Sequence, residues 1–128
     1  MQLLLDTHAL LWWLLSDRSL SPAARDAIGD PDNSTFVSAA SGWEIATKYR
    51  IGKLPRAAFL AGDFVRIAGT QGFAELPISI RHGQLAGSLP GIHKDPFDRI
   101  LIAQAIVSDM TIVSNEELFG AYGVARLW

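Results

Sequence analysis

The strongest constraint on the fold is a short apolar run at residues 2–5, in which polar and apolar side chains do not alternate. Such a run is typical of a strand that is buried on both faces, as in a parallel sheet covered by helices on each side. The segment at residues 9–15 follows almost directly and has the composition of a helix. A strand followed at once by a helix predicts the first part of a βαβ unit.

The alternation of strands and helices continues along the chain. Ser21 and Pro22 predict a helix start, and Gly29 stands where that helix should end. Further helices are expected at residues 41–51, 56–71, 80–87 and 96–108, with a helical turn at 116–119. Further strands are expected at residues 35–38, 73–78, 110–113 and 124–127. Because each crossover is long enough for a right-handed connection, we predict one domain, residues 1–128, that folds as a three-layer α/β/α sandwich on a mostly parallel central sheet.

The composition excludes several classes of site. The chain has no cysteine, which excludes disulfides, thiolate zinc sites and cysteine nucleophiles. Its net charge is −2, so any binding of nucleic acid must come from a local basic patch. The apolar stretch at residues 9–15 is far shorter than the roughly 20 residues that span a bilayer, and no basic residue precedes it as in a signal peptide. We therefore expect a soluble, cytoplasmic protein without a membrane segment.

Four acidic residues stand where this topology brings the ends of strands and helices together. Asp6 ends the first strand, and Glu44 lies near the start of the helix after the second strand. Asp98 is in the first turn of the helix at 96–108, and Glu116 follows the strand at 110–113. In an open parallel sheet, ligands bind beyond the carboxyl ends of the strands, so all four acids are expected at one edge of the sheet.

Each of these acids also has a purely structural interpretation, as a helix cap or a first-turn charge. These interpretations are Asp6 as an N-cap, Glu44 in a capping box with Ser41, Asp98 behind the cap Asp95, and Glu116 behind the cap Ser114. Four carboxylates in one cleft repel, however, and would not all stay ionised without a compensating cation. An oxygen-only ligand set favours Mg²⁺ or Mn²⁺ over Zn²⁺, and carboxylate-held divalent ions are typical of metal-dependent nucleases.

Four segments, in this order, resemble the motifs of PIN-domain proteins of the VapC toxin type. They are residues 6–13 (DTHALLWW), 38–45 (SAASGWEI), 93–105 (HKDPFDR, then AQA) and 113–116 (VSNE), the last followed by Phe119 and by residues 122–124 (YGV). The resemblance covers essentially the whole chain. It implies a PIN fold, dependence on Mg²⁺ or Mn²⁺, endoribonuclease activity, and a toxin role that a small cognate antitoxin of the VapB type neutralises.

The resemblance also implies roles for single residues. The family's first three acidic positions fall on Asp6, Glu44 and Asp98, with Asp6 and Asp98 expected as direct metal ligands. The fourth position is usually Asp and is Glu116 here, so its longer side chain is expected to reach the ion through water or to serve a second ion only. Three auxiliary residues complete this set: the hydroxyls of Thr7 and Ser114, expected to bond metal-bound water, and Asp95, expected as a helix cap that assists.

A cluster of basic residues begins one turn after Glu44. It consists of Lys48, Arg50, Lys53 and Arg56, and Arg99 is a further candidate for phosphate contact. The cluster suits an RNA backbone, and it is equally consistent with a solvated helix face. In the VapC resemblance an antitoxin arginine is expected to enter the acidic cleft, and a homodimer is expected.

Two other classes of function remain open from the sequence. A phosphoacceptor signalling domain also carries acids and Mg²⁺ at strand ends, but it needs a second acid beside Asp6, which is absent. A non-catalytic module is the other alternative, in which the acids hold a structural ion or the basic segment of a partner. Three histidines, His8, His82 and His93, are scattered and are expected to have structural or solvent-facing roles.

Overall fold

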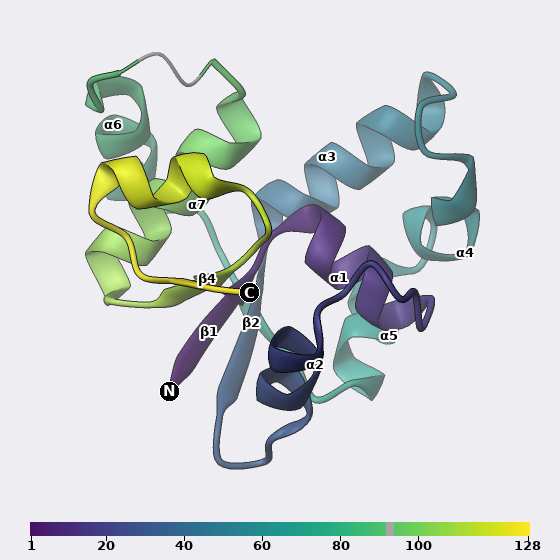
Figure 1. Ribbon diagram of the computed structural model, residues 1–128. Coiled ribbons are helices and arrows are strands. Elements are labelled where there is room, and N and C mark those ends of the chain that lie inside the picture. Colours follow the sequence, from purple (N-terminus) through teal and green to yellow (C-terminus); the bar gives the residue numbers. More distant parts are fainter. Residues whose placement is uncertain (92–93) are drawn as a thin grey trace.

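The computed structural model describes residues 1–91 and 94–128, and its strands form one parallel sheet in the order β3-β2-β1-β4-β5 (Figure 1). Within this part of the chain every strand pairing is parallel, so the predicted mostly parallel sheet is confirmed. The strands are β1 (Gln2–Leu5), β2 (Ser34–Ser38), β3 (Ala74–Leu76), β4 (Thr111–Val113) and β5 (Arg126–Leu127). The helices are α1 (Thr7–Leu14), α2 (Pro22–Gly29), α3 (Ala39–Arg50), α4 (Ala58–Ala61), α5 (Phe64–Thr70), α6 (Ile80–Ser88) and α7 (Pro96–Ser108), with 3-10 helices η1 (Pro55–Ala57) and η2 (Glu117–Tyr122).

Strand β1 lies at the centre of the sheet and is buried on both faces, as its sequence predicts. Leu3, Leu4 and Leu5 are each 0% exposed. Leu3 and Leu5 belong to a core cluster with α1, α2, α4 and α5, whereas Leu4 belongs to a second cluster with α7 and η2. Burial of each leucine side chain stabilises the folded protein by about 1.5–3 kcal/mol. A strand with apolar side chains on both sides therefore stabilises the packing on both faces of the sheet.

The helices cover the two faces of the sheet and confirm the three-layer architecture. Helices α6 and α7 lie on one side of the strands, and α1, α2 and α5 lie on the other (Figure 1). No helix among the residues that the structure describes is long and apolar enough to cross a membrane.

The starts of two helices differ from the expected positions. Helix α1 begins at Thr7, because the Asp6 carboxylate caps it by accepting a hydrogen bond from the Ala9 N–H at 2.8 Å. Helix α3 begins at Ala39 behind Ser38, whose hydroxyl accepts from the Ala40 N–H at 3.0 Å. The predicted start at Ser41 and its capping box are therefore wrong, and Glu44 lies in the second turn of α3. The caps predicted at Ser21 and Asp95 are confirmed, and Ser79 caps the helix expected at residues 80–87.

The single helix predicted at residues 56–71 is wrong. The segment folds as η1, α4 and α5, and α4 ends at Ala61 with Gly62 as its C-cap. Asp63 has φ −149°, well outside the helical region, and this turn changes the direction of the chain. Leu60 of α4 and Ala68 of α5 both belong to the core cluster on this side of the sheet.

Candidate active site

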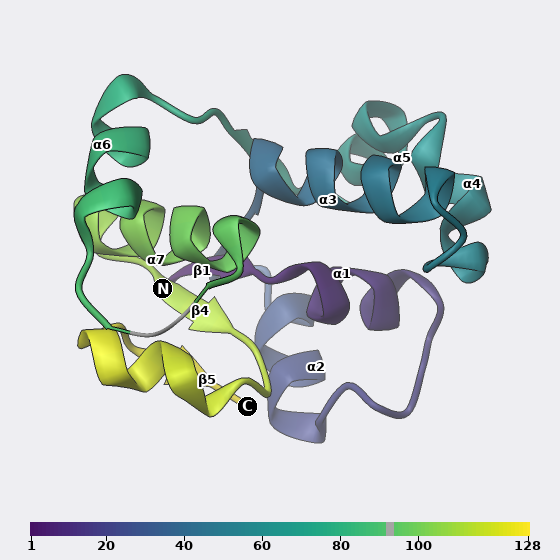
Figure 2. The ribbon, with the colours of Figure 1, turned by 90° about the horizontal axis from the view of Figure 1, so that it is seen from above.

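The carboxyl ends of the central strands meet at one edge of the sheet, which Figure 2 shows from above. Asp6 follows β1, and its N–H donates to the Val113 carbonyl at the end of β4 at 3.2 Å. Helices α1, α3 and α7 surround this edge (Figure 2). Together they enclose a cleft of about 360 Å³. The cleft is lined by Asp6, Thr7, His8, Trp12, Glu44, Lys48, Asp95, Asp98, Asn115 and Glu116. The four acids singled out in the sequence thus lie in one cleft.

Asp6 lies at the floor of the cleft and is 6% exposed. Burial raises the pKa of its carboxyl, and the charge of Glu44 raises it further. Hydrogen bonds from Ser114 and Ala9 and the charge of His8 act in the opposite direction and lower this pKa. Ser114 therefore favours the ionised form of Asp6.

Glu44 is buried and has a hydrogen-bonding partner on each carboxylate oxygen. The Thr7 hydroxyl donates to Oε1, and the Lys48 ammonium contacts Oε2. The Thr7 hydroxyl also lies 3.2 Å from the Ser41 hydroxyl. Thr7 joins α1 to α3 through this contact, and the orientation of Glu44 is set from both sides.

Asp98 carries the clearest electrostatic sign of a crowded acidic site. Partial burial raises its pKa from 3.8 to about 7, and the charges of Asp95, Glu44, Asp6 and Glu116 act in the same direction. Asp95 caps α7 by accepting hydrogen bonds from the N–H groups of Phe97 at 2.9 Å and Asp98 at 3.3 Å. The cap holds Asp98 in the first turn of the helix, beside the other acids.

Glu116 lies at the exposed rim of the cleft, and it is a cap as well as a cleft residue. Its carboxylate accepts a hydrogen bond from the Leu118 N–H at 3.2 Å, at the start of η2. The Ser114 hydroxyl accepts from the Glu116 N–H at 2.9 Å, so Ser114 orders this turn without being the N-cap of η2. The expected helical turn at 116–119 is in fact this longer 3-10 helix.

The cleft residues fit a hard divalent cation by their chemistry. Every acidic donor is an oxygen, and a positive charge in the cleft would offset both the burial and the neighbouring negative charges that raise the Asp98 pKa. Across residues 1–91 and 94–128, no three acidic or histidine side chains already stand in metal-ligand geometry. This agrees with the hydrogen bonds that the carboxylates of Asp6, Glu44 and Glu116 accept from the protein, which hold them in their present positions. Cation binding therefore requires these side chains to move into ligand geometry.

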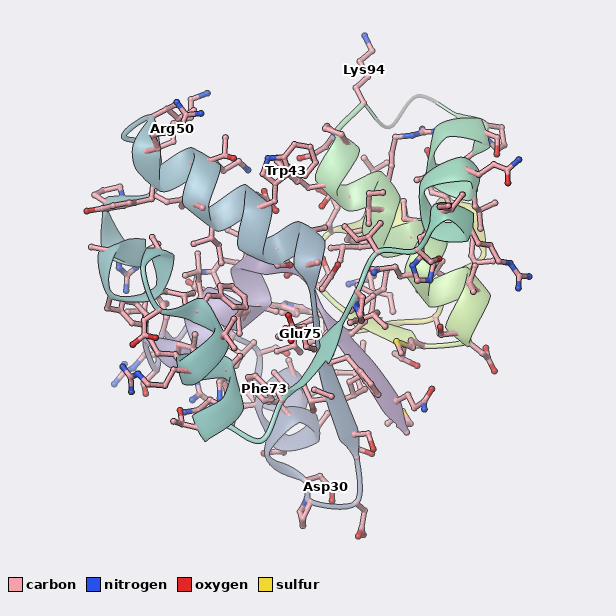
Figure 3. The ribbon with its side chains drawn as sticks, turned by 180° about the vertical axis from the view of Figure 1, so that it is seen from behind. Asp30, Trp43, Arg50, Phe73, Glu75 and Lys94 are labelled. Carbon is pink, nitrogen blue, oxygen red and sulfur yellow. The ribbon has the colours of Figure 1, made fainter. Side chains whose placement is uncertain are left out.

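Of the basic residues expected to contact RNA, only Lys48 lies in the cleft. Burial by itself lowers the pKa of its ammonium. The hydrogen bond to Glu44 and the negative charges of Glu44, Asp95 and Asp98 act in the opposite direction, and the net shift of this pKa is upward. Arg50 and Lys53 are exposed beyond the cleft, and Arg50 lies at the far end of α3 (Figure 3). Arg56 pairs with Asp17 at 2.9 Å.

Arg99 is placed differently from the expectation. Its guanidinium donates to the carbonyls of Ala86 at 2.9 Å and Leu89 at 2.5 Å, which joins α7 to the end of α6. It does not line the cleft, and we assign it a structural role rather than phosphate contact.

Sequence reasoning did not place His8, Trp12 and Asn115 at the site, yet all three line the cleft. The spacing of His8 and Trp12 could have found them, because residues four apart share one face of a helix that begins beside Asp6. Asn115 was detectable by its position between Ser114 and Glu116 in the fourth motif.

The other aromatic and histidine residues have packing roles. Trp13 packs on Phe73, and Trp43 of α3 (Figure 3) meets the ring of Phe97 edge-on at 4.8 Å. His82 is buried and completes the cap of α6 with Ser79. His93 lies outside the described residues.

A model of the PIN domain family matches residues 3–124. The chain belongs to the PIN-domain family. Over 65 residues it is 42% identical to Ribonuclease VapC16 of Mycobacterium tuberculosis. That match covers 48% of this PIN domain and 43% of the relative, so it spans less than half the length of the relative.

Two solved structures share the fold of this PIN domain. VapBC2 from Rickettsia felis, bound to a DNA fragment from its promoter, gives a TM-score of 0.72 at 14% identity and covers 98% of this chain and 97% of that chain. A toxin–antitoxin complex from Klebsiella pneumoniae gives 0.53 at 20% identity and covers 88% of this chain and 85% of that chain. At these identities the likeness concerns the fold of the PIN domain.

Proposed function

We propose that this PIN domain is a metal-dependent endoribonuclease and the toxin of a VapBC-type toxin–antitoxin pair. The observation that carries the proposal is the gathering of Asp6, Glu44, Asp98 and Glu116 in one cleft at the carboxyl edge of a PIN-domain sheet. The ribonuclease relative supports RNA as the substrate, although it aligns over only 48% of the chain.

In this proposal Asp6 and Asp98 ligate Mg²⁺ or Mn²⁺ directly, and Glu44 and Glu116 complete the site directly or through water. A bound divalent cation supplies a Lewis acid that activates water and stabilises the charge developing on a phosphodiester. A hydrolysis of this kind needs no covalent intermediate on the protein.

The chain's own residues prepare the site for this reaction. Thr7 and Lys48 orient the Glu44 carboxylate from two sides, and the Ser114 hydrogen bond favours the ionised form of Asp6 against the effect of burial. The Lys48 ammonium is placed to contact a phosphate that enters the cleft, and Asp95 holds Asp98 at the start of α7 through its cap. These residues orient the acids, so that little rearrangement remains for the transition state.

A small antitoxin of the VapB type is the proposed protein partner, and a homodimer is the proposed assembly. The toxin–antitoxin complex among the structural neighbours supports a partner of this class. An antitoxin arginine that enters the cleft would meet the same carboxylates as the metal. Neutralisation of the toxin would follow from this competition for one negatively charged cleft.

The test is RNA cleavage by the purified protein with end-labelled single-stranded RNA. We expect internal cleavage in Mg²⁺ or Mn²⁺, loss of cleavage in EDTA, and its recovery when the metal is returned. Undiminished cleavage by a repurified sample in EDTA would contradict the metal mechanism. A folded protein that never cleaves RNA but binds its antitoxin would favour the non-catalytic module.

A further inference from the structure

Three aromatic rings form a continuous row that starts inside the acidic cleft. The rings of His8 and Trp12 are 5.6 Å apart and tilted by 41°, and those of Trp12 and Trp128 are 5.7 Å apart and tilted by 56°. His8 and Trp12 lie one turn apart on α1, so they share one face of that helix. The row therefore runs along α1 and ends at the last residue of the chain.

The two ends of the row have different surroundings. His8 is exposed and lines the cleft with Trp12, next to the acids on its floor. Trp12 and Trp128 are half-buried and pack against the core cluster under α1. The inner rings are thus held in place by packing, while the cleft end is open to a ligand.

The walls of the cleft differ in chemistry. Lys48 on α3 contributes its cationic side chain, and His8 and Trp12 on α1 contribute aromatic rings. A phosphodiester placed at the carboxylates carries a base on each side, and an aromatic wall beside the phosphate gives one base a surface on which to stack. Only an unpaired base has a free face, because the bases of a duplex already stack on their neighbours.

We propose that His8 and Trp12 form a stacking subsite for one unpaired nucleobase next to the scissile phosphate. The inference rests on the proposed ribonuclease function and adds to that site a surface for a base beside the phosphate. Stacking depends on the face of the base and not on its hydrogen-bonding edge, so the subsite selects for lack of pairing more than for sequence. Trp128 acts on the subsite only through Trp12, as a positioning residue.

The test measures RNA binding in EDTA, where no cleavage occurs, by fluorescence anisotropy. The probes are a labelled single-stranded RNA that contains the cleavage site mapped with the metal-loaded protein, and the same RNA with an abasic nucleotide on either side of that site. We expect Trp12→Leu to weaken binding about fivefold to a hundredfold, and Trp12→Phe to retain most of the affinity. The abasic RNA should bind the wild type with a similar loss, and Trp12→Leu should show no further loss on it.

Two further variants keep the test decisive. Trp43→Leu is the matched control, because Trp43 is 59% exposed and packs on Phe97 outside the cleft lining. We expect its affinity to equal that of the wild type. His8→Ala removes an exposed ring at little risk to folding, and it should weaken binding severalfold even if Trp12→Leu fails to fold.

The possible failures are distinguishable. A wild type that cleaves no RNA contradicts the proposed function itself. A wild type that cleaves RNA and binds intact and abasic probes equally contradicts the stacking subsite alone. If His8→Ala and Trp12→Leu weaken binding of the antitoxin but leave RNA binding unchanged, the row is a protein-docking surface and our assignment of its ligand is wrong.

Discussion

Asp98→Asn is expected to lower RNA cleavage by at least about a hundredfold while it stabilises the metal-free protein at pH 8. The substitution preserves the shape of the side chain but removes one of the two charges assigned to direct metal ligation. It also removes a carboxylate whose pKa partial burial and four neighbouring acids raise to about 7. If Asp98 only stabilised its helix, the substitution would instead lower activity and stability together.

The pH dependence of this stabilisation follows from the direction of the shift. Because the pKa of Asp98 is raised on folding from 3.8 to about 7, the folded protein binds more protons than the unfolded chain between these values. The contribution of Asp98 to stability is therefore present below pH 4 and is lost as the pH rises through 7. At pH 8 in EDTA we expect Asp98→Asn to gain about 1–3 kcal/mol, a figure reduced for the solvent that still reaches this side chain.

The measurement is the urea unfolding of both proteins in EDTA at pH 5 and pH 8. The gain at pH 8 should shrink at pH 5, where the wild-type carboxyl is mostly protonated. Full cleavage activity in Asp98→Asn would contradict its assignment to the metal site. A stability loss of about 1 kcal/mol at both pH values would indicate a first-turn helix charge and nothing more.

Lys48→Met is expected to destabilise the metal-free protein by about 1–3 kcal/mol at pH 8. Its ammonium is the partner of the buried Glu44 carboxylate, and its side chain is 29% exposed. Loss of one partner from a buried ion pair costs about 3–5 kcal/mol, and we expect less here because Lys48 is partly solvated. Added Mg²⁺ should restore part of the loss, since a cation in the cleft replaces the missing charge.

Lys53→Met is the matched control for this prediction, because it removes the same charge from an exposed position near the end of α3. We expect its stability to change by less than about 0.5 kcal/mol. The double variant Lys48→Met/Glu44→Gln should recover most of the stability that Lys48→Met loses. Equal stability of Lys48→Met and the wild type in EDTA would mean that the ion pair contributes nothing.

The central strand and the site-bearing edge of the sheet were predictable because their signals are local. Three consecutive leucines require two covered faces, and Ser21, Ser79 and Asp95 are cap residues whose hydrogen bonds reach only two or three residues ahead. A parallel sheet then brings the ends of β1, β2 and β4 together without further information. The gathering of Asp6, Glu44, Asp98 and Glu116 follows from the topology alone.

The features that sequence reasoning missed depend on contacts between distant segments. Ser38 and Ser41 are both plausible caps, and the strand that ends at Ser38 decides between them. The break at Gly62 and Asp63 interrupts a segment whose apolar residues have helical spacing, so that spacing alone does not predict it. Arg99 resembles a phosphate ligand beside Asp98 in the sequence, but the end of α6 supplies two carbonyls for its guanidinium.

The central claim is that the carboxylates of the cleft hold a divalent cation. Its most direct test is a Mn²⁺ titration followed by electron paramagnetic resonance, with the wild type, Asp6→Asn and Glu116→Gln. We predict that the wild type binds Mn²⁺ and that Asp6→Asn weakens the affinity by at least about tenfold. Glu116→Gln should weaken it less, because Glu116 is exposed and already caps η2. Equal affinity of the wild type and Asp6→Asn for Mn²⁺ would contradict the account.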